Sequence, residues 1–141
     1  MVIMRISFIG YKENPINFFK ELALELSHKV SGLELNERFV PSLEDLPIVA
    51  LEETEDSEFI FVFAVTSDDA EKLLIEEKLV DVELSSKTRI LKAIELDDFS
   101  DLNEEQYLEE KDTLVNHYSD VVIGILFNEI SFEPQEKDFS I

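Results

Sequence analysis

Eight consecutive residues, FIFVFAVT at positions 59–66, constrain the fold of this chain more than any other part of its sequence. The run contains no charged residue, and its single polar residue, Thr66, stands at its end. A strand with one face in water would alternate apolar and polar side chains, whereas a strand covered on both faces would not. The run therefore predicts a central strand of a parallel sheet with helices on both sides.

The rest of the chain predicts an alternation of strands and helices around this strand. Asn14 and Pro15 predict the start of the first helix, and Pro47 falls in the expected first turn of the second. The order βαβαβαβα favours one α/β domain with three layers, α/β/α, built on a parallel four-stranded sheet. Strands are expected at residues 2–9, 35–40, 59–66 and 89–96, and helices at residues 15–30, 43–53, 69–84 and 103–127.

The last part of the chain leaves two interpretations open. The segment VVIGILF at positions 121–127 is compatible with a fifth strand, but apolar residues keep a spacing of three and four from Tyr107 onward. We therefore predict one long helix that contains Gly124. The domain is expected to span residues 1–130. Residues 131–141, SFEPQEKDFSI, lack periodicity and predict an acidic, loosely ordered tail.

The charge of the chain narrows the classes of partner. Thirty-three Asp and Glu residues face twelve Lys and Arg residues, which gives a formal net charge of −21. Nucleic acids and anionic membranes are unfavourable partners for such a chain, because both bind proteins through Lys and Arg. The acidic residues predict a solvated surface, and the alternative is that they bind cations or a basic partner.

The sequence also predicts the compartment. The longest apolar run, residues 121–127, is far shorter than the roughly 20 residues that span a bilayer. The first ten residues, MVIMRISFIG, have one Arg and no small-residue cleavage site, so they predict a strand and not a signal peptide. The chain has no Cys, which fits a reducing compartment. A cytoplasmic protein is expected.

One joint of the chain carries a family resemblance. In RFVPSLEDLPIVALEE, residues 38–53, a strand ends at Val40, Pro41 breaks it, and Asp45-Leu46-Pro47 begins a helix. This joint resembles one half of the ligand site in the lumazine synthase and archaeal riboflavin synthase family. SSKTRI at 85–90 and HYSDVVIGILF at 117–127 are similar to the turn before the family's last strand and to the end of its final helix.

The resemblance extends over about residues 4–127. It implies the flavodoxin-like strand order 2-1-3-4 and a homo-oligomer, a pentamer in the family. Five copies would carry a formal charge of 5 × −21 = −105, so their mutual repulsion is expected to favour high ionic strength or bound cations at the interfaces.

The resemblance also implies a site for a lumazine-like or flavin-like heterocycle. Tyr11 would stack on the ring, and the alternative is that Tyr11 packs on the next chain. Pro41 and Ser42 would contribute backbone groups. Ser42 stands where the family has Gly, and its side chain would restrict the approach of a ligand. Glu44 and Asp45 would bind ribityl hydroxyls, or instead favour the start of the helix that follows.

The loop after the third predicted strand departs from the family. The family holds a phosphate there with a glycine-rich backbone, whereas this chain has Thr66, Ser67, Asp68 and Asp69. Thr66 and Ser67 can still donate hydrogen bonds to a ligand, but the two carboxylates would repel a phosphate. Capping of the next helix by Ser67 or Asp68 is the stronger interpretation.

Catalytic residues cannot be assigned from the sequence. The family's histidine, where present, lies on the helix after this loop, and this chain has His28 and His117 elsewhere. Glu44, Glu71, Lys72 and Lys87 remain as acid–base candidates that nothing distinguishes. The sequence indicates no particular cofactor.

A weaker possibility is a divalent-cation site. Asp68 and Asp69 follow the third strand, and Asp97 and Asp98 follow the fourth, so all four are expected at the same edge of the sheet. The alternative is a solvated acidic rim.

We therefore predict a member of this fold that has lost the family's catalytic site and acts as an oligomeric binding or scaffold protein. The alternatives are a divergent riboflavin-pathway transferase and an acidic cation-binding protein.

Overall fold

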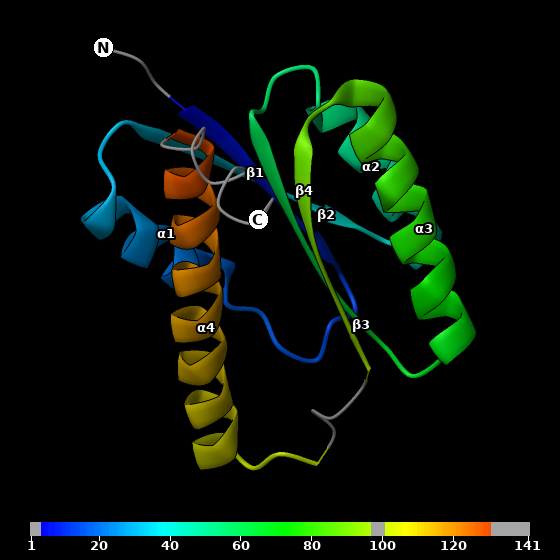
Figure 1. The fold of residues 1–141 in the computed structure, drawn as a ribbon. Helices are drawn as coiled ribbons and strands as arrows, with labels where there is room; N and C mark the ends of the chain where they lie inside the picture. Colours follow the sequence, from blue (N-terminus) through cyan, green and yellow to red (C-terminus); the bar gives the residue numbers. More distant parts are fainter. Residues whose placement is uncertain (1–3, 97–100, 131–141) are drawn as a thin grey trace, which may run out of the picture.

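Four parallel strands form the sheet of this protein (Figure 1). The structure, a computed structural model, describes residues 4–96 and 101–130, and side chains as far as residue 127. The sheet has the order β2-β1-β3-β4, which confirms the predicted fold class and strand order. Its strands are β1 (Met4–Tyr11), β2 (Leu33–Val40), β3 (Phe59–Thr66) and β4 (Arg89–Leu96). The helices are α1 (Phe19–Lys29), η1 (Leu43–Asp45, a 3-10 turn), α2 (Leu46–Glu53), α3 (Asp69–Ser86) and α4 (Glu104–Ile130).

Helices cover both faces of the sheet, as Figure 1 shows: α1 and α4 lie on one side, and α2 and α3 on the other. All eight residues of β3 are buried, as the apolar run predicts. Its side chains alternate between the two faces. Phe59, Phe61 and Phe63 belong to the core under α1 and α4, whereas Ile60 and Val62 belong to the core under α2 and α3.

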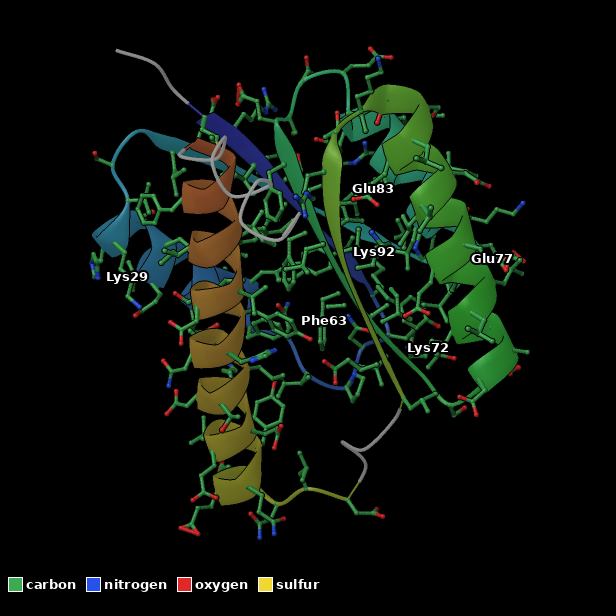
Figure 2. The ribbon with its side chains drawn as sticks, in the orientation of Figure 1. Lys29, Phe63, Lys72, Glu77, Glu83 and Lys92 are labelled. Carbon is green, nitrogen blue, oxygen red and sulfur yellow. The ribbon has the colours of Figure 1, made fainter. Side chains whose placement is uncertain are left out.

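The two cores differ in chemistry. The core under α1 and α4 is aromatic: Phe18 lies edge-on to Phe63 with ring centroids 4.8 Å apart, and it stacks with Tyr118 at 5.9 Å. Figure 2 shows Phe63 in the space between α4 and the sheet. The core under α2 and α3 is aliphatic, with Leu46 and Leu79 fully buried in it.

One predicted helix start is wrong. Helix α1 begins at Phe19 with Phe18 as its N-cap, and not at Asn14 and Pro15. The Asn14 side chain instead contacts β3: its Oδ1 accepts a hydrogen bond from Val65 N–H at 2.9 Å, and its Nδ2 donates to the Phe63 carbonyl at 3.1 Å. An amide that bonds to another strand is not available to cap a local helix.

The other elements lie close to their predicted positions. The segment at 121–127 lies within α4, so the helical interpretation of this stretch is confirmed. Pro47 lies in the first turn of α2, as predicted. Within the described residues, no helix is long and apolar enough to cross a membrane. The predicted tail, residues 131–141, lies outside the described residues, as do Asp97 and Asp98.

Candidate functional site

The carboxyl edge of the sheet holds a cavity between β1 and β3. These strands are the point at which the chain changes direction across the sheet, because β2 adjoins β1 on one side and β3 adjoins it on the other. Ligands of open parallel sheets bind at such points. The cavity has a volume of about 330 Å³. Its lining comes from the loop after β1, from η1, from the end of β3 and from α3: Tyr11, Glu13, Pro15, Leu43, Val65, Thr66, Ser67 and Glu71.

The structure brings together three of the seven residues predicted to bind a ligand. Tyr11, Thr66 and Ser67 line this cavity, which we call the Tyr11 cavity. Tyr11 also borders a second hollow of about 230 Å³, whose lining includes Phe39 and Phe63. Tyr11 therefore borders two spaces, one lined by Phe39 and Phe63 and the other by Thr66, Ser67 and Glu71.

The other four predicted ligand residues do not line the Tyr11 cavity. Pro41 and Ser42 lie in the loop after β2, and the Ser42 carbonyl accepts a hydrogen bond from Asp45 N–H at 3.0 Å. Glu44 borders a separate groove between α2 and α3. Asp45 is the N-cap residue of α2, but its side chain makes no capping hydrogen bond; its negative charge is still favourable at a helix start.

Backbone N–H groups at the start of α3 donate hydrogen bonds to side chains of the same segment. Asp68 Oδ1 accepts hydrogen bonds from Ala70 N–H at 2.9 Å and Glu71 N–H at 3.3 Å, so the predicted cap is confirmed. Thr66 Oγ1 donates to Glu71 Oε1 at 2.7 Å and accepts from Asp68 N–H at 3.2 Å. Three donors that an anion could use here, Ala70 N–H, Glu71 N–H and the Thr66 hydroxyl, are therefore engaged by carboxylates.

Among the described residues, the lining of the Tyr11 cavity contains two carboxylates, Glu13 and Glu71, and no basic side chain. Glu13 is exposed, whereas Thr66 is buried beneath the rim. Such a lining favours a neutral or cationic ligand over a phosphorylated one.

The predicted cation site is not assembled from described residues. Asp68 acts as the cap of α3, and Asp69 lies exposed in the first turn of that helix. Within residues 4–96 and 101–130, no group of three or more His, Asp or Glu side chains is placed to hold a metal ion.

Neither histidine lines the Tyr11 cavity. His28 lies in the last turn of α1. His117 is exposed on α4, where its ring packs edge-on against Tyr118 with centroids 4.7 Å apart.

A second polar cluster lies under α2, and no sequence pattern predicted it. Ser7 on β1 is fully buried; its Oγ donates to Glu53 Oε1 at 2.6 Å and lies 2.7 Å from Ser57 Oγ. Asn36 and Arg38 also donate to the Glu53 carboxylate, at 3.1 and 3.0 Å. Burial raises the pKa of Glu53, but the hydrogen bonds from Ser7, Arg38 and Asn36 and the Arg38 charge outweigh it and lower the pKa.

No protein-family model matches this chain, and no curated protein matches it. The geometry of the Tyr11 cavity and of the α3 start therefore carries the functional argument.

Proposed function

We propose that this protein is a non-catalytic, self-associating binding or scaffold protein with the architecture of the lumazine synthase and riboflavin synthase family. One observation carries the proposal. The helix start that would hold a phosphate in that family is capped here by Asp68, and the adjacent Thr66 hydroxyl is bonded to Glu71. The parallel sheet with the order β2-β1-β3-β4 is consistent with the resemblance.

Apolar side chains on the surface of α2 and α3 support self-association. Ile48 and Leu51 on α2 are 57% and 51% exposed, and Leu74 on α3 is 55% exposed. Ile48 and Leu74 border the same groove, which has a volume of about 370 Å³. Apolar residues grouped in this way are typical of surfaces that a partner covers. We propose that a second copy of this chain covers the groove, in the pentamer that the resemblance implies.

Sedimentation velocity in high salt tests self-association. The wild-type chain is expected to sediment as an oligomer, and I48E and L74E as monomers, because each would place a carboxylate in an apolar interface. L24E is the matched control, since Leu24 is 60% exposed on α1, away from the groove. A monomeric wild-type chain at all salt concentrations would contradict this part of the proposal.

Loss of catalysis is tested separately, by turnover of 6,7-dimethyl-8-ribityllumazine. No riboflavin is expected from the folded protein. Formation of riboflavin that is abolished in Y11A would instead support the alternative, a divergent riboflavin-pathway transferase.

A second candidate function is the binding of a neutral heterocycle, and the Tyr11 cavity favours it. The aromatic ring of Tyr11 provides a stacking surface, and Ser67 provides a hydroxyl. A thermal-shift titration with riboflavin, 6,7-dimethyl-8-ribityllumazine and flavin mononucleotide tests it. A rise in melting temperature with the two unphosphorylated compounds, reduced in Y11A, is expected. Flavin mononucleotide is expected to bind more weakly because its phosphate would meet Glu13 and Glu71.

A further inference from the structure

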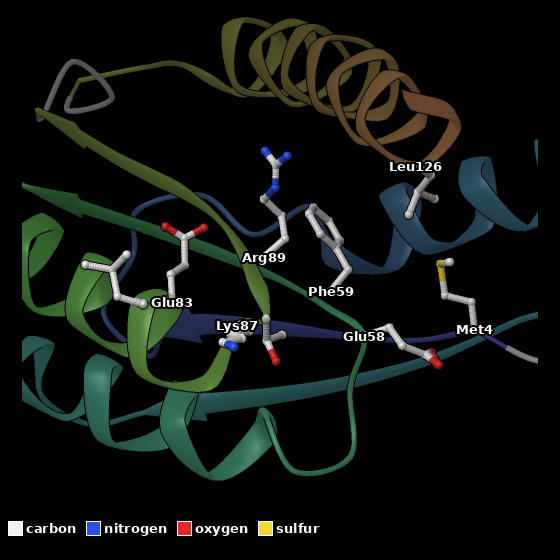
Figure 3. Close-up of a pocket in the computed structure, with 9 residues that line it drawn as sticks. Met4, Glu58, Phe59, Glu83, Lys87, Arg89 and Leu126 are labelled. Carbon is white, nitrogen blue, oxygen red and sulfur yellow. The ribbon is translucent and has the colours of Figure 1, made fainter. Parts of the chain in front are cut away.

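A cavity of about 460 Å³ lies at the amino edge of the sheet, at the opposite end of the strands from the Tyr11 cavity (Figure 3). Its apolar lining comes from four elements: Met4 begins β1, Phe59 begins β3, Leu84 lies in the last turns of α3, and Leu126 lies on α4. Phe59 and Leu126 are buried, whereas Leu84 is 72% exposed at the rim. We call this space the amino-edge cavity.

Two carboxylates border the amino-edge cavity, and both are bonded to the protein. Glu58 Oε1 accepts a hydrogen bond from Arg5 N–H at 2.7 Å. Glu83 Oε2 accepts from Ile90 N–H at 2.7 Å, and Glu83 Oε1 accepts from Lys92 Nζ at 2.6 Å. Figure 2 shows Glu83 and Lys92 facing each other between α3 and β4. The negative charge of Glu83 is therefore compensated within the protein.

Two basic residues also border the cavity. Lys87 follows the last residue of α3, and Arg89 begins β4 beside Phe59, its neighbour in the sheet register. In Figure 3, the side chains of Arg89 and Phe59 both extend toward the helix that carries Leu126. The Lys87 ammonium forms no ion pair with another residue of the described chain. The cavity thus combines an apolar wall with cationic groups, in a protein with a net charge of −21.

The backbone of Lys87 is unusual. Its φ of 61° places it in the left-handed region, where it ends α3 through a hydrogen bond from its N–H to the Glu83 carbonyl. Glycine is the usual residue at such a helix end because a Cβ atom is disfavoured there. The positive charge of Lys87 is favourable at a helix C-terminus, but that effect does not require a residue in the left-handed region. Strain of this kind is often retained where a side chain serves a ligand.

We propose that the amino-edge cavity is a binding site for a small organic monoanion, a carboxylate with an aromatic or branched apolar body. The carboxylate would bind the Lys87 ammonium, and the apolar body would contact Phe59, Leu84 and Leu126. The volume of the cavity lies within the range of small-molecule sites. The net charge of the protein opposes a multiply charged anion more strongly than a monoanion. This site is independent of the Tyr11 cavity and of the proposed function.

Titration with phenylacetate, followed by amide chemical shifts of the ¹⁵N-labelled full chain, tests the proposal. Phenylacetamide is the matched neutral compound, since it has the same body and no charge. Saturable shifts of the amide signals of Phe59, Lys87 and Arg89 are expected with phenylacetate. Phenylacetate is also expected to bind at least about tenfold more strongly than phenylacetamide, because the charge-assisted hydrogen bonds to the carboxylate are lost in the amide. Equal binding of the two compounds, or shifts confined to Tyr11 and Thr66, would overturn the proposal.

Two substitutions separate the ligand role of Lys87 from a structural one. K87Q keeps a side chain in the same left-handed conformation but removes the charge, and it is expected to weaken phenylacetate binding about tenfold or more. K87G is expected to weaken binding equally while raising the melting temperature, because it relieves the backbone strain. K20Q, at an exposed position of α1, is the control and is expected to bind as the wild type. Unchanged binding in both Lys87 variants would refute the assignment.

Discussion

The Asn14 side chain joins the loop after β1 to the end of β3, where its Oδ1 accepts a hydrogen bond from Val65 N–H at 2.9 Å. The register of β1 with β3 ends at Gly10 and Phe63, so no backbone group of β1 is paired with Val65. The Asn14 amide continues the hydrogen bonding beyond that point, because it also donates to the Phe63 carbonyl. It thereby fixes the loop that carries Tyr11 against the strand that carries Thr66.

Replacement of Asn14 is therefore expected to destabilise the protein. N14A would leave Val65 N–H and the Phe63 carbonyl without these partners in a partly buried position, at a cost of about 1–3 kcal/mol in the free energy of unfolding. N14D keeps the acceptor but places a carboxylate against a carbonyl, and it is expected to lose a similar amount. Urea unfolding monitored by circular dichroism measures both. The control N116A, at an exposed position of α4, should change stability by less than about 0.5 kcal/mol.

Two glycines of the chain are expected to respond in opposite ways to alanine. A Cβ on Gly10 would lie 2.9 Å from Phe19 Cε2 and 3.0 Å from Phe39 Cε1. Phe19 is buried and cannot easily move away, so G10A is expected to cost about 1–3 kcal/mol. A Cβ on Gly124 would meet no atom within 4 Å, and Gly124 lies inside α4. G124A is therefore expected to stabilise the protein by about 1 kcal/mol.

Thermal unfolding of the two glycine variants side by side measures these effects. A stabilised G10A would show that the Phe19 and Phe39 rings can move apart without loss. A destabilised G124A would show that this side of α4 is covered, which would point to an interface there.

The layers of this fold could be predicted because they depend on local patterns. The uniform apolar character of β3 requires cover on both faces, and the periodicity of the helices provides it. The role of Asn14 could not be predicted, because its partners lie 49 and 51 residues along the chain. The local pattern, Asn-Pro before an apolar helical segment, predicted a helix cap. In the structure, the Asn14 side chain instead makes the tertiary contact with β3.

The candidate site could be predicted in part: its residues at strand ends could be, and its residues from the surrounding loops could not. Tyr11, Thr66 and Ser67 follow strand ends, and strand ends of a parallel sheet meet at one edge. Leu43 and Glu13 border the Tyr11 cavity only because loops from different strands come together, which no spacing in the sequence indicates. Glu71 had a partial signal, since it falls in the first turn of the helix that follows Thr66.

The Glu53 carboxylate is expected to make stability depend on pH. Because its pKa is lowered in the folded protein, its contribution is fully present above the unfolded pKa, near about 4.3, and is lost as the pH falls through the folded pKa. E53Q removes this contribution and should cost about 1–3 kcal/mol at pH 7, with a smaller difference from the wild type at lower pH. Urea unfolding of both proteins between pH 7 and pH 3 measures the difference.

E52Q is the matched control for this experiment. Glu52 also bonds Arg38, at 2.9 Å, but it is 57% exposed and forms a surface pair, so its replacement should cost at most about 1 kcal/mol. The free energies of unfolding of E53Q and the wild type should approach each other as the pH falls. If they do not, the cluster of Ser7, Asn36 and Glu53 does not hold the carboxylate in its charged form.

The cap of α3 permits a test of the argument that the anion site is closed. D68A removes the acceptor of Ala70 N–H and Glu71 N–H and is expected to cost about 0.5–2 kcal/mol in the free energy of unfolding. The same change exposes these donors at a helix N-terminus, where an anion is favoured. Inorganic phosphate is therefore expected to raise the melting temperature of the double variant D68A/E71Q more than that of the wild type.

D69A, which keeps the Asp68 cap, is the control and should show no gain with phosphate. Equal stabilisation of the wild type and the double variant by phosphate would mean that Asp68 and Glu71 do not close this site, and the proposed loss of the family's phosphate loop would then be wrong.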